Sequence, residues 1–132
     1  MNFTGLMKAF FSFLIFLAPC VLHAQSAAPD LLKKKWNYIG IEEFSVVHAP
    51  DSAHKNDWLL FKDDGTYEWV QSGKTAYGVW KLNEVAKTIS VTDSKTKKSL
   101  TYNLKNLTAT DLTIEYQSPD LVRTKYRYAA AK

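Results

Sequence analysis

The sequence predicts an all-β domain, an eight-stranded antiparallel up-and-down β-barrel that follows an N-terminal signal peptide. After residue 35, apolar and polar residues alternate with a period of two, and short polar turns separate the alternating segments. No segment after residue 24 keeps a 3.6-residue apolar period beyond two turns, so no helix is expected to cover a sheet. Closure into a barrel then protects the edges of strands that each have one apolar face.

Residues 1–24 have the pattern of a secretory signal peptide. Lys8 is their only charge, and an apolar run at residues 9–17 follows it. This run is shorter than the roughly 20 apolar residues that a membrane-spanning helix needs. We therefore predict export to the periplasm or out of the cell, with cleavage after Ala24 and, as the second choice, after Ala28.

Cys20 is the only cysteine in the chain, and it lies where a bacterial lipoprotein would carry its acylated cysteine. Such motifs place a small residue just before the cysteine, and Pro19 does not fit that position. A lipid anchor through Cys20 is therefore the minor alternative. If the signal peptide is removed, no thiol remains, and the domain folds without a disulfide.

The remaining chain divides into a linker with a short helical turn at residues 25–35, the barrel at 36–129 and a tail at 130–132. The first strand is expected at 36–47, with a bend at Gly40 that lets it serve two neighbours. The other seven strands are expected at residues 57–62, 66–71, 75–82, 87–92, 99–105, 111–117 and 121–129.

The turns and the outward positions support a soluble barrel. Asp63-Asp64-Gly65 is a strong hairpin signal, because Asp and Gly tolerate the positive φ of tight turns. Most of the strands are shorter than the about 9–11 residues of a membrane barrel. Their outward positions carry Lys, Thr, Glu and Arg, where a membrane barrel would carry an apolar band.

Four segments share a pattern with a known family. Residues 32–36 (LKKKW) place a Trp at the start of the first strand, and 60–67 (LFKDDGTY) match hydrophobic-Phe-x-x-Asp-Gly-Thr-aromatic. Residues 78–82 (GVWKL) carry Gly-x-Trp, and 104–112 (LKNLTATDL) carry Leu-Thr-x-x-x-Leu. In order and spacing they resemble bacterial lipocalin-like domains, except that Lys34 stands where the family often has Gly. The resemblance implies a small exported barrel with a shallow cup for a small hydrophobic or amphipathic ligand.

Tyr and Trp side chains on the apolar strand faces are the candidate ligand-binding residues, because rings with hydroxyl and indole N–H groups suit an amphipathic ligand. They are Tyr67, Trp69, Trp80, Tyr102, Tyr116 and Tyr126, and Tyr128 faces the same way. The alternative is that these rings simply fill the barrel. Volume separates the two interpretations, because a drug-sized ligand needs roughly 300 Å³ or more.

Catalytic and metal sites are not expected, and neither is a cofactor. His48 and His54 share one loop with Asp51 and Asp57. Such side chains can ligate Zn²⁺ or a harder cation, but their spacing matches no recognised metal signature. We interpret the loop as a polar cover over the barrel mouth. Acidic residues adjacent on a strand point to opposite faces, so they do not form a catalytic pair.

Positive charge gathers in two groups, Lys33, Lys34 and Lys35 before the first strand and Arg123, Lys125 and Arg127 on the last. A closed barrel pairs these strands, so the groups could form one basic patch for an anionic surface or protein. The alternative, that these residues form a solvated face without a partner in a protein of net charge +4, is favoured. We expect the protein to be a monomer that does not bind nucleic acid. The second function considered is a non-catalytic interaction domain, an envelope accessory protein or inhibitor with a filled barrel.

Overall fold

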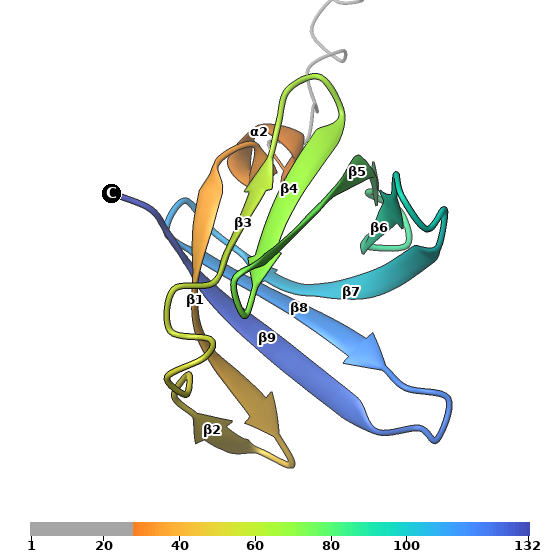
Figure 1. The fold of residues 1–132 in the computed structure, drawn as a ribbon. Coiled ribbons are helices and arrows are strands. Elements are labelled where there is room, and N and C mark those ends of the chain that lie inside the picture. Colours follow the sequence, from red (N-terminus) through yellow and green to blue (C-terminus); the bar gives the residue numbers. More distant parts are fainter. Residues whose placement is uncertain (1–27) are drawn as a thin grey trace, which may run out of the picture.

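A computed structural model describes residues 28–132 (Figure 1), so the predicted signal peptide and Cys20 lie outside the described residues. A short helix, α2 (Ala28–Leu32), comes first. Nine strands follow: β1 (Lys35–Glu43), β2 (Val46–His48), β3 (Trp58–Phe61), β4 (Thr66–Gln71), β5 (Lys74–Asn83), β6 (Thr88–Asp93), β7 (Ser99–Leu107), β8 (Asp111–Gln117) and β9 (Arg123–Ala130). No helix among residues 28–132 is long and apolar enough to cross a membrane.

The strands form an antiparallel sheet that closes on itself. The order is β2-β1-β3-β4-β5-β6-β7-β8-β9, and β1 also pairs with β9. Eight strands, β1 and β3 to β9, therefore make a closed up-and-down barrel, and β2 is an addition at one end of β1. The predicted fold class is confirmed. The seven later strands begin and end within two residues of the expected ranges.

The expected single strand at 36–47 is wrong, because two strands occupy this range. Phe44 and Ser45 have φ of 49° and 63°, and two consecutive residues in the left-handed region reverse the chain into a tight hairpin. The expectation of two neighbours is confirmed, since residues 35–37 pair with β3 and residues 41–43 pair with β2.

The bend expected at Gly40 is also present. The register of β1 against β9 shifts between Tyr38 and Gly40, which marks a bulge. A Cβ placed on Gly40 would lie 2.8 Å from the carbonyl oxygen of His48. Glycine therefore lets the chain after β2 approach the backbone of β1 closely.

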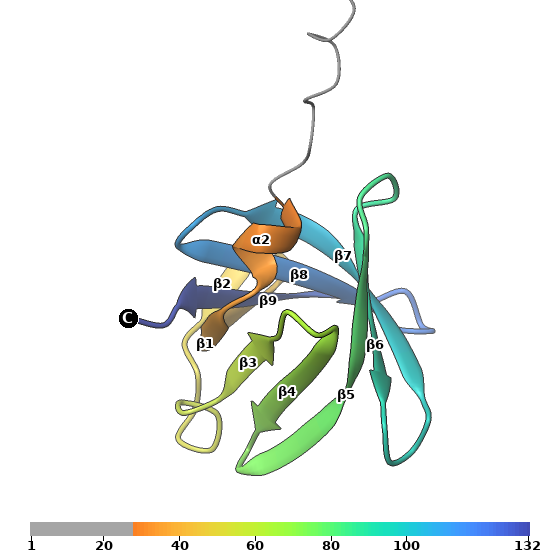
Figure 2. The same cartoon turned by 90° about the horizontal axis from the view of Figure 1, so that it is seen from above.

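Aromatic and aliphatic side chains from all eight barrel strands fill the interior. At one end, α2 lies across the barrel (Figure 2), and Leu32 and Trp36 are fully buried. The Trp36 indole Nε1 donates a hydrogen bond of 3.0 Å to the Leu32 carbonyl oxygen. Phe61 and Trp80 pack nearby with ring centroids 5.0 Å apart. The barrel interior is therefore closed at the α2 end.

Candidate functional site

The six predicted ligand residues lie within or against the barrel core. Four of them, Tyr67, Trp69, Trp80 and Tyr102, are buried, and Tyr116 and Tyr126 are half-buried against the same cluster. The Tyr102 ring lies 5.5 Å from Trp69 and 5.8 Å from Tyr116, centroid to centroid. Of the six, only Tyr126 lines any of the three pockets described below.

The pocket that Tyr126 lines has a volume of about 430 Å³. The loop after β2, which supplies part of its lining, lies at the end of the barrel away from α2 (Figure 1). We call this cavity the mouth pocket. β1 and β9 supply its barrel wall, and the loop after β2 with the end of β4 supplies its rim. The lining residues are Tyr38, Ile41, His48, Ala49, Asp51, His54, Asp57, Gln71, Tyr126 and Tyr128. The polar loop and the aromatic barrel face, two separate expectations from the sequence, therefore meet in one cavity.

Three tyrosine rings form the barrel wall of the mouth pocket. Tyr38 on β1 lies directly across from Tyr128 on β9, and Ile41 lies across from Tyr126. The Tyr38 and Tyr128 rings are 5.6 Å apart, centroid to centroid, and tilted by 57°. The two rings are therefore tilted against each other and not stacked face to face.

The loop at residues 49–57, which we call the rim loop, is fixed to the barrel by Asp57. The Asp57 side chain is 7% exposed, and its Oδ2 lies 2.8 Å from Nδ1 of His54. Its Oδ1 accepts a hydrogen bond of 2.8 Å from the backbone N–H of Ser72, in the β4–β5 turn. Its carbonyl oxygen accepts another, of 3.0 Å, from the backbone N–H of Tyr38. The loop is thus tied to β1 and to the neighbouring hairpin through a single residue.

The rim loop is also braced within itself, because Oδ1 of Asp51 accepts a hydrogen bond of 3.0 Å from the backbone N–H of His54. Among residues 28–132, no three His, Cys, Asp or Glu side chains are placed to hold a metal ion together. Nδ1 of His54 bonds to Asp57 instead, and the other ring nitrogen, Nε2, takes no part in this bond.

Buried polar groups lie next to the mouth pocket. Burial raises the pKa of Tyr128 well above its ordinary value, Tyr102 adds to this, and the nearby Trp69 opposes it. Nε1 of Trp69 is completely buried and has no hydrogen-bond partner within the described part of the chain. Burial also raises the pKa of Tyr38, with smaller effects from Tyr126 and from nearby carboxylates. The interior beside the pocket therefore keeps its phenols protonated and able to donate hydrogen bonds.

The hydrogen bond to Asp57 raises the pKa of His54 above its ordinary value. The ion pair therefore stabilises the fold most at low pH, below the pKa of an unfolded histidine, and the contribution is lost as the pH rises through the folded pKa. We expect the coupling between His54 and Asp57, measured by a thermal-unfolding cycle of His54→Gln, Asp57→Asn and the double variant, to be larger at about pH 5 than at about pH 8. A coupling that grows with pH would contradict this assignment.

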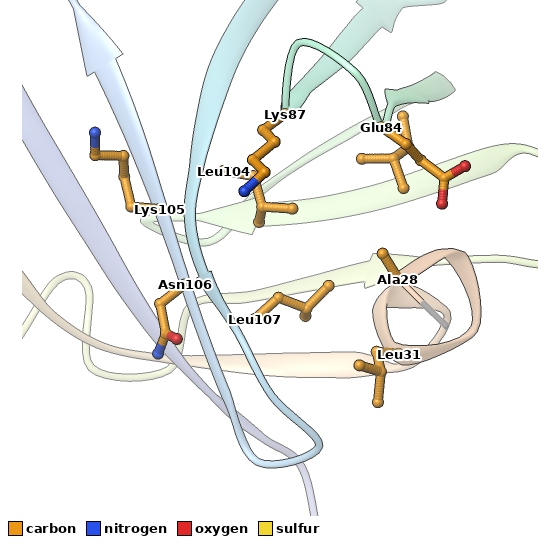
Figure 3. A pocket seen from close by; sticks show the side chains of 9 residues that line it. Ala28, Leu31, Glu84, Lys87, Leu104, Lys105, Asn106 and Leu107 are labelled. Carbon is orange, nitrogen blue, oxygen red and sulfur yellow. The ribbon is translucent and has the colours of Figure 1, made fainter. Parts of the chain in front are cut away.

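A second pocket, of about 450 Å³, lies beside α2 (Figure 3). Ala28 and Leu31 of α2 face Leu104 and Leu107 of β7 across it, with Lys87 at its edge. A third, of about 440 Å³, lies between the β1–β2 turn and the β8–β9 loop. Neither pocket contains any of the six predicted ligand residues.

The two basic groups singled out from the sequence are separated along the β1–β9 seam, with Lys35 at one end of β1 and Lys125 level with the other. Lys35 is level with the end of β9, because its carbonyl oxygen accepts a hydrogen bond from the backbone N–H of Ala131. Lys125 lies across from Glu42 and forms an ion pair with it at 3.5 Å. Lys33 lies 3.8 Å from the carboxylates of Asp30 and Asp63. Several of these charges therefore have acidic partners.

Sequence reasoning missed Tyr38, Ile41 and Gln71 as pocket residues. Tyr38 lies two residues after Trp36, so the period-2 pattern could have placed it on the interior face. Ile41 follows the bulge at Gly40, where the alternation breaks, and Gln71 lines the pocket only because the rim loop folds over the end of β4. No local sequence pattern predicts that Ile41 and Gln71 line the pocket.

One solved structure with a similar fold is that of a DUF4847 family protein from Bacteroides vulgatus ATCC 8482. The TM-score is 0.58 and the sequence identity 14%, over 81% of this chain and 99% of that chain. The likeness supports the eight-stranded barrel that the lipocalin resemblance implied, and at this identity it shows the fold alone. No protein-family model matches the sequence, and no curated protein matches it.

Proposed function

We propose that this protein is an exported, non-catalytic binding domain that takes a small amphipathic molecule into the mouth pocket. The observation that carries the proposal is the pocket itself. Its volume of about 430 Å³ exceeds the roughly 300 Å³ that a drug-sized ligand needs. An apolar wall with a polar rim is the usual construction of such sites.

The wall and the rim supply different parts of the recognition. The rings of Tyr38, Tyr126 and Tyr128 provide apolar surface at low conformational cost, because each side chain has only two rotatable bonds before the hydroxyl. His54 and Gln71 at the rim offer hydrogen-bonding groups to the polar end of a ligand. The attachment of the rim through Asp57 holds the cavity open before binding, which reduces the ordering cost of association.

The test uses a neutral fluorescent amphiphile, N-phenyl-naphthylamine. We expect saturable binding to the purified protein, and about a tenfold loss of affinity in Tyr126→Ser, because one aromatic contact in a desolvated site is worth about 1.4 kcal/mol. The matched control is Tyr77→Ser, which removes a tyrosine that is 55% exposed on the outer face of β5. Absence of saturable binding, or equal losses in the two variants, would refute the proposal.

A non-catalytic interaction domain is the second candidate, and the filled core favours it. The aromatic side chains of β4, β5 and β7 pack against one another, so the barrel interior away from the mouth pocket is occupied by protein. Native mass spectrometry of protein purified from its own host distinguishes the two functions. A retained small molecule supports the binding domain, and a co-purified protein without one supports the interaction domain.

A further inference from the structure

We propose that the mouth pocket selects a compact organic cation, an alkylammonium or similar group, which lies against the faces of Tyr38, Tyr126 and Tyr128 and near the carboxylates of the rim. This inference rests on the proposed function and names its ligand class. It comes from the combination of aromatic rings and acidic side chains around the cavity, with no lysine or arginine among the described residues that line it.

The rings supply the first part of the argument. A cation is attracted to the electron-rich face of an aromatic ring, and several rings around one site form an aromatic cage. Tyr38 and the buried Tyr128 are tilted by 57° at 5.6 Å and are not stacked face to face, and both line the pocket. Tyr126 is the third ring, one inward position along β9 from Tyr128.

The charges supply the second part. Asp51 and Asp57 line the pocket, and none of the residues lining it within the described chain is Lys or Arg. Glu43, at the end of β1, is close enough to raise the pKa of both Tyr38 and Tyr126, after the larger effect of burial. His54 is bonded to Asp57, and the hydrogen bond raises its pKa, so its positive charge is paired within the rim and is lost at high pH. The potential in the cavity therefore favours a cation over an anion.

The test compares three ligands of nearly the same shape: choline, neohexanol, in which a carbon replaces the ammonium nitrogen, and the tert-butylacetate anion. We expect choline to bind the full protein at least about tenfold more tightly than neohexanol, since a desolvated cation–π contact is worth about tenfold or more in affinity. The anion is expected to bind weakest. Isothermal titration calorimetry measures all three affinities.

Two variants separate the rings from the charge. Tyr126→Leu keeps an apolar side chain but removes a ring, so choline should lose several-fold in affinity while neohexanol changes little. Asp51→Asn, on the exposed loop, should weaken choline alone. The controls are Tyr77→Leu on the outer face and Asp30→Asn at the α2 end. If Tyr126→Leu unfolds, Asp51→Asn still tests the charge preference.

Acidity provides an independent readout. The titratable groups facing the cavity are His48, His54, Asp51, Asp57 and the three tyrosines, with Glu43 beside them. Protonation of His54 adds positive charge beside Asp57, so choline affinity should fall between about pH 8 and about pH 5, and neohexanol affinity should not.

The outcomes distinguish the two proposals. If N-phenyl-naphthylamine binds but choline binds no better than neohexanol or the anion, the binding function stands and the cation preference is overturned. If neither the fluorescent amphiphile nor any of the three ligands binds, the proposed function fails, and the cation site fails with it. Choline binding that depends on Tyr126 and Asp51 and weakens with acid supports both.

Discussion

Replacing Trp36 by alanine is expected to lower the free energy of unfolding by about 3–5 kcal/mol, a large part of the about 5–15 kcal/mol typical of a domain. The side chain is fully buried under α2, and its indole N–H satisfies the Leu32 carbonyl oxygen. The variant loses the packing of both the barrel end and the helix that covers it. Thermal unfolding should show the midpoint falling on the order of 20 °C.

The matched control is Trp58→Ala on the adjacent strand, β3. Trp58 is half-buried, and the ammonium of Lys35 lies 4.5 Å from the centre of its ring on the outer face. Its loss should cost about 1 kcal/mol. Equal destabilisation by the two Trp→Ala variants would show that α2 does not close the barrel as described.

Gly78→Ala is expected to cost about 3 kcal/mol or more, although it adds only one methyl group. A Cβ on Gly78 would lie far inside van der Waals contact of the Thr92 carbonyl oxygen on β6 and 2.9 Å from Cε1 of Tyr67. The first obstacle is backbone, so the β5–β6 pairing itself must shift to relieve the clash. Urea unfolding of the purified variant measures the loss.

Gly65→Ala serves as the control for this variant. Gly65 has φ of +82°, and nothing lies within 4 Å of a Cβ placed on it. Alanine there meets only the backbone penalty of the left-handed region, about 1–2 kcal/mol. If Gly65→Ala proved the more destabilising of the two, crowding between β5 and β6 would not be what requires glycine at position 78.

Most of the barrel could be predicted because its strands obey local rules. In β6, Ile89 and Val91 face inward and are buried, as their spacing indicates. Polar turn sequences such as residues 63–65 lie between the strands, and each strand ends at the position that these residues predict. Short connections then leave an antiparallel meander as the simplest arrangement. The closed sheet follows from many independent signals that agree.

The hairpin at the end of β1 could not be predicted, because its turn residues are atypical. Tight two-residue hairpins usually contain Asn and Gly, which tolerate positive φ. Phe44 and Ser45 fill those positions here, and Phe44 is 84% exposed, so neither burial nor turn composition indicates a reversal. A long apolar strand was the simpler interpretation of the same residues.

The candidate site could be predicted only in its components. The sequence indicated both an inward Tyr126 and a polar loop that contains His54 and Asp57. Their meeting depends on the register of β1 against β9 and on the hydrogen bond from Ser72 to Asp57, which joins residues of separate segments. Strand register and tertiary hydrogen bonds leave no local sequence pattern, so the cavity could be identified only from the three-dimensional structure.

Because β1 pairs with β9, the closing seam joins the first and last strands of the described chain. Every other barrel pairing joins consecutive strands, except that β1 pairs with β3 across β2 and the loop after it, so these pairings join segments that are close in sequence. Closure alone must bring distant segments together, and such non-local contacts slow folding. Until β9 docks, β1 and β8 each present an unsatisfied edge, and this open sheet is the species most exposed to pairing with another chain. Docking of the final strand therefore removes the two edges that could pair with another chain.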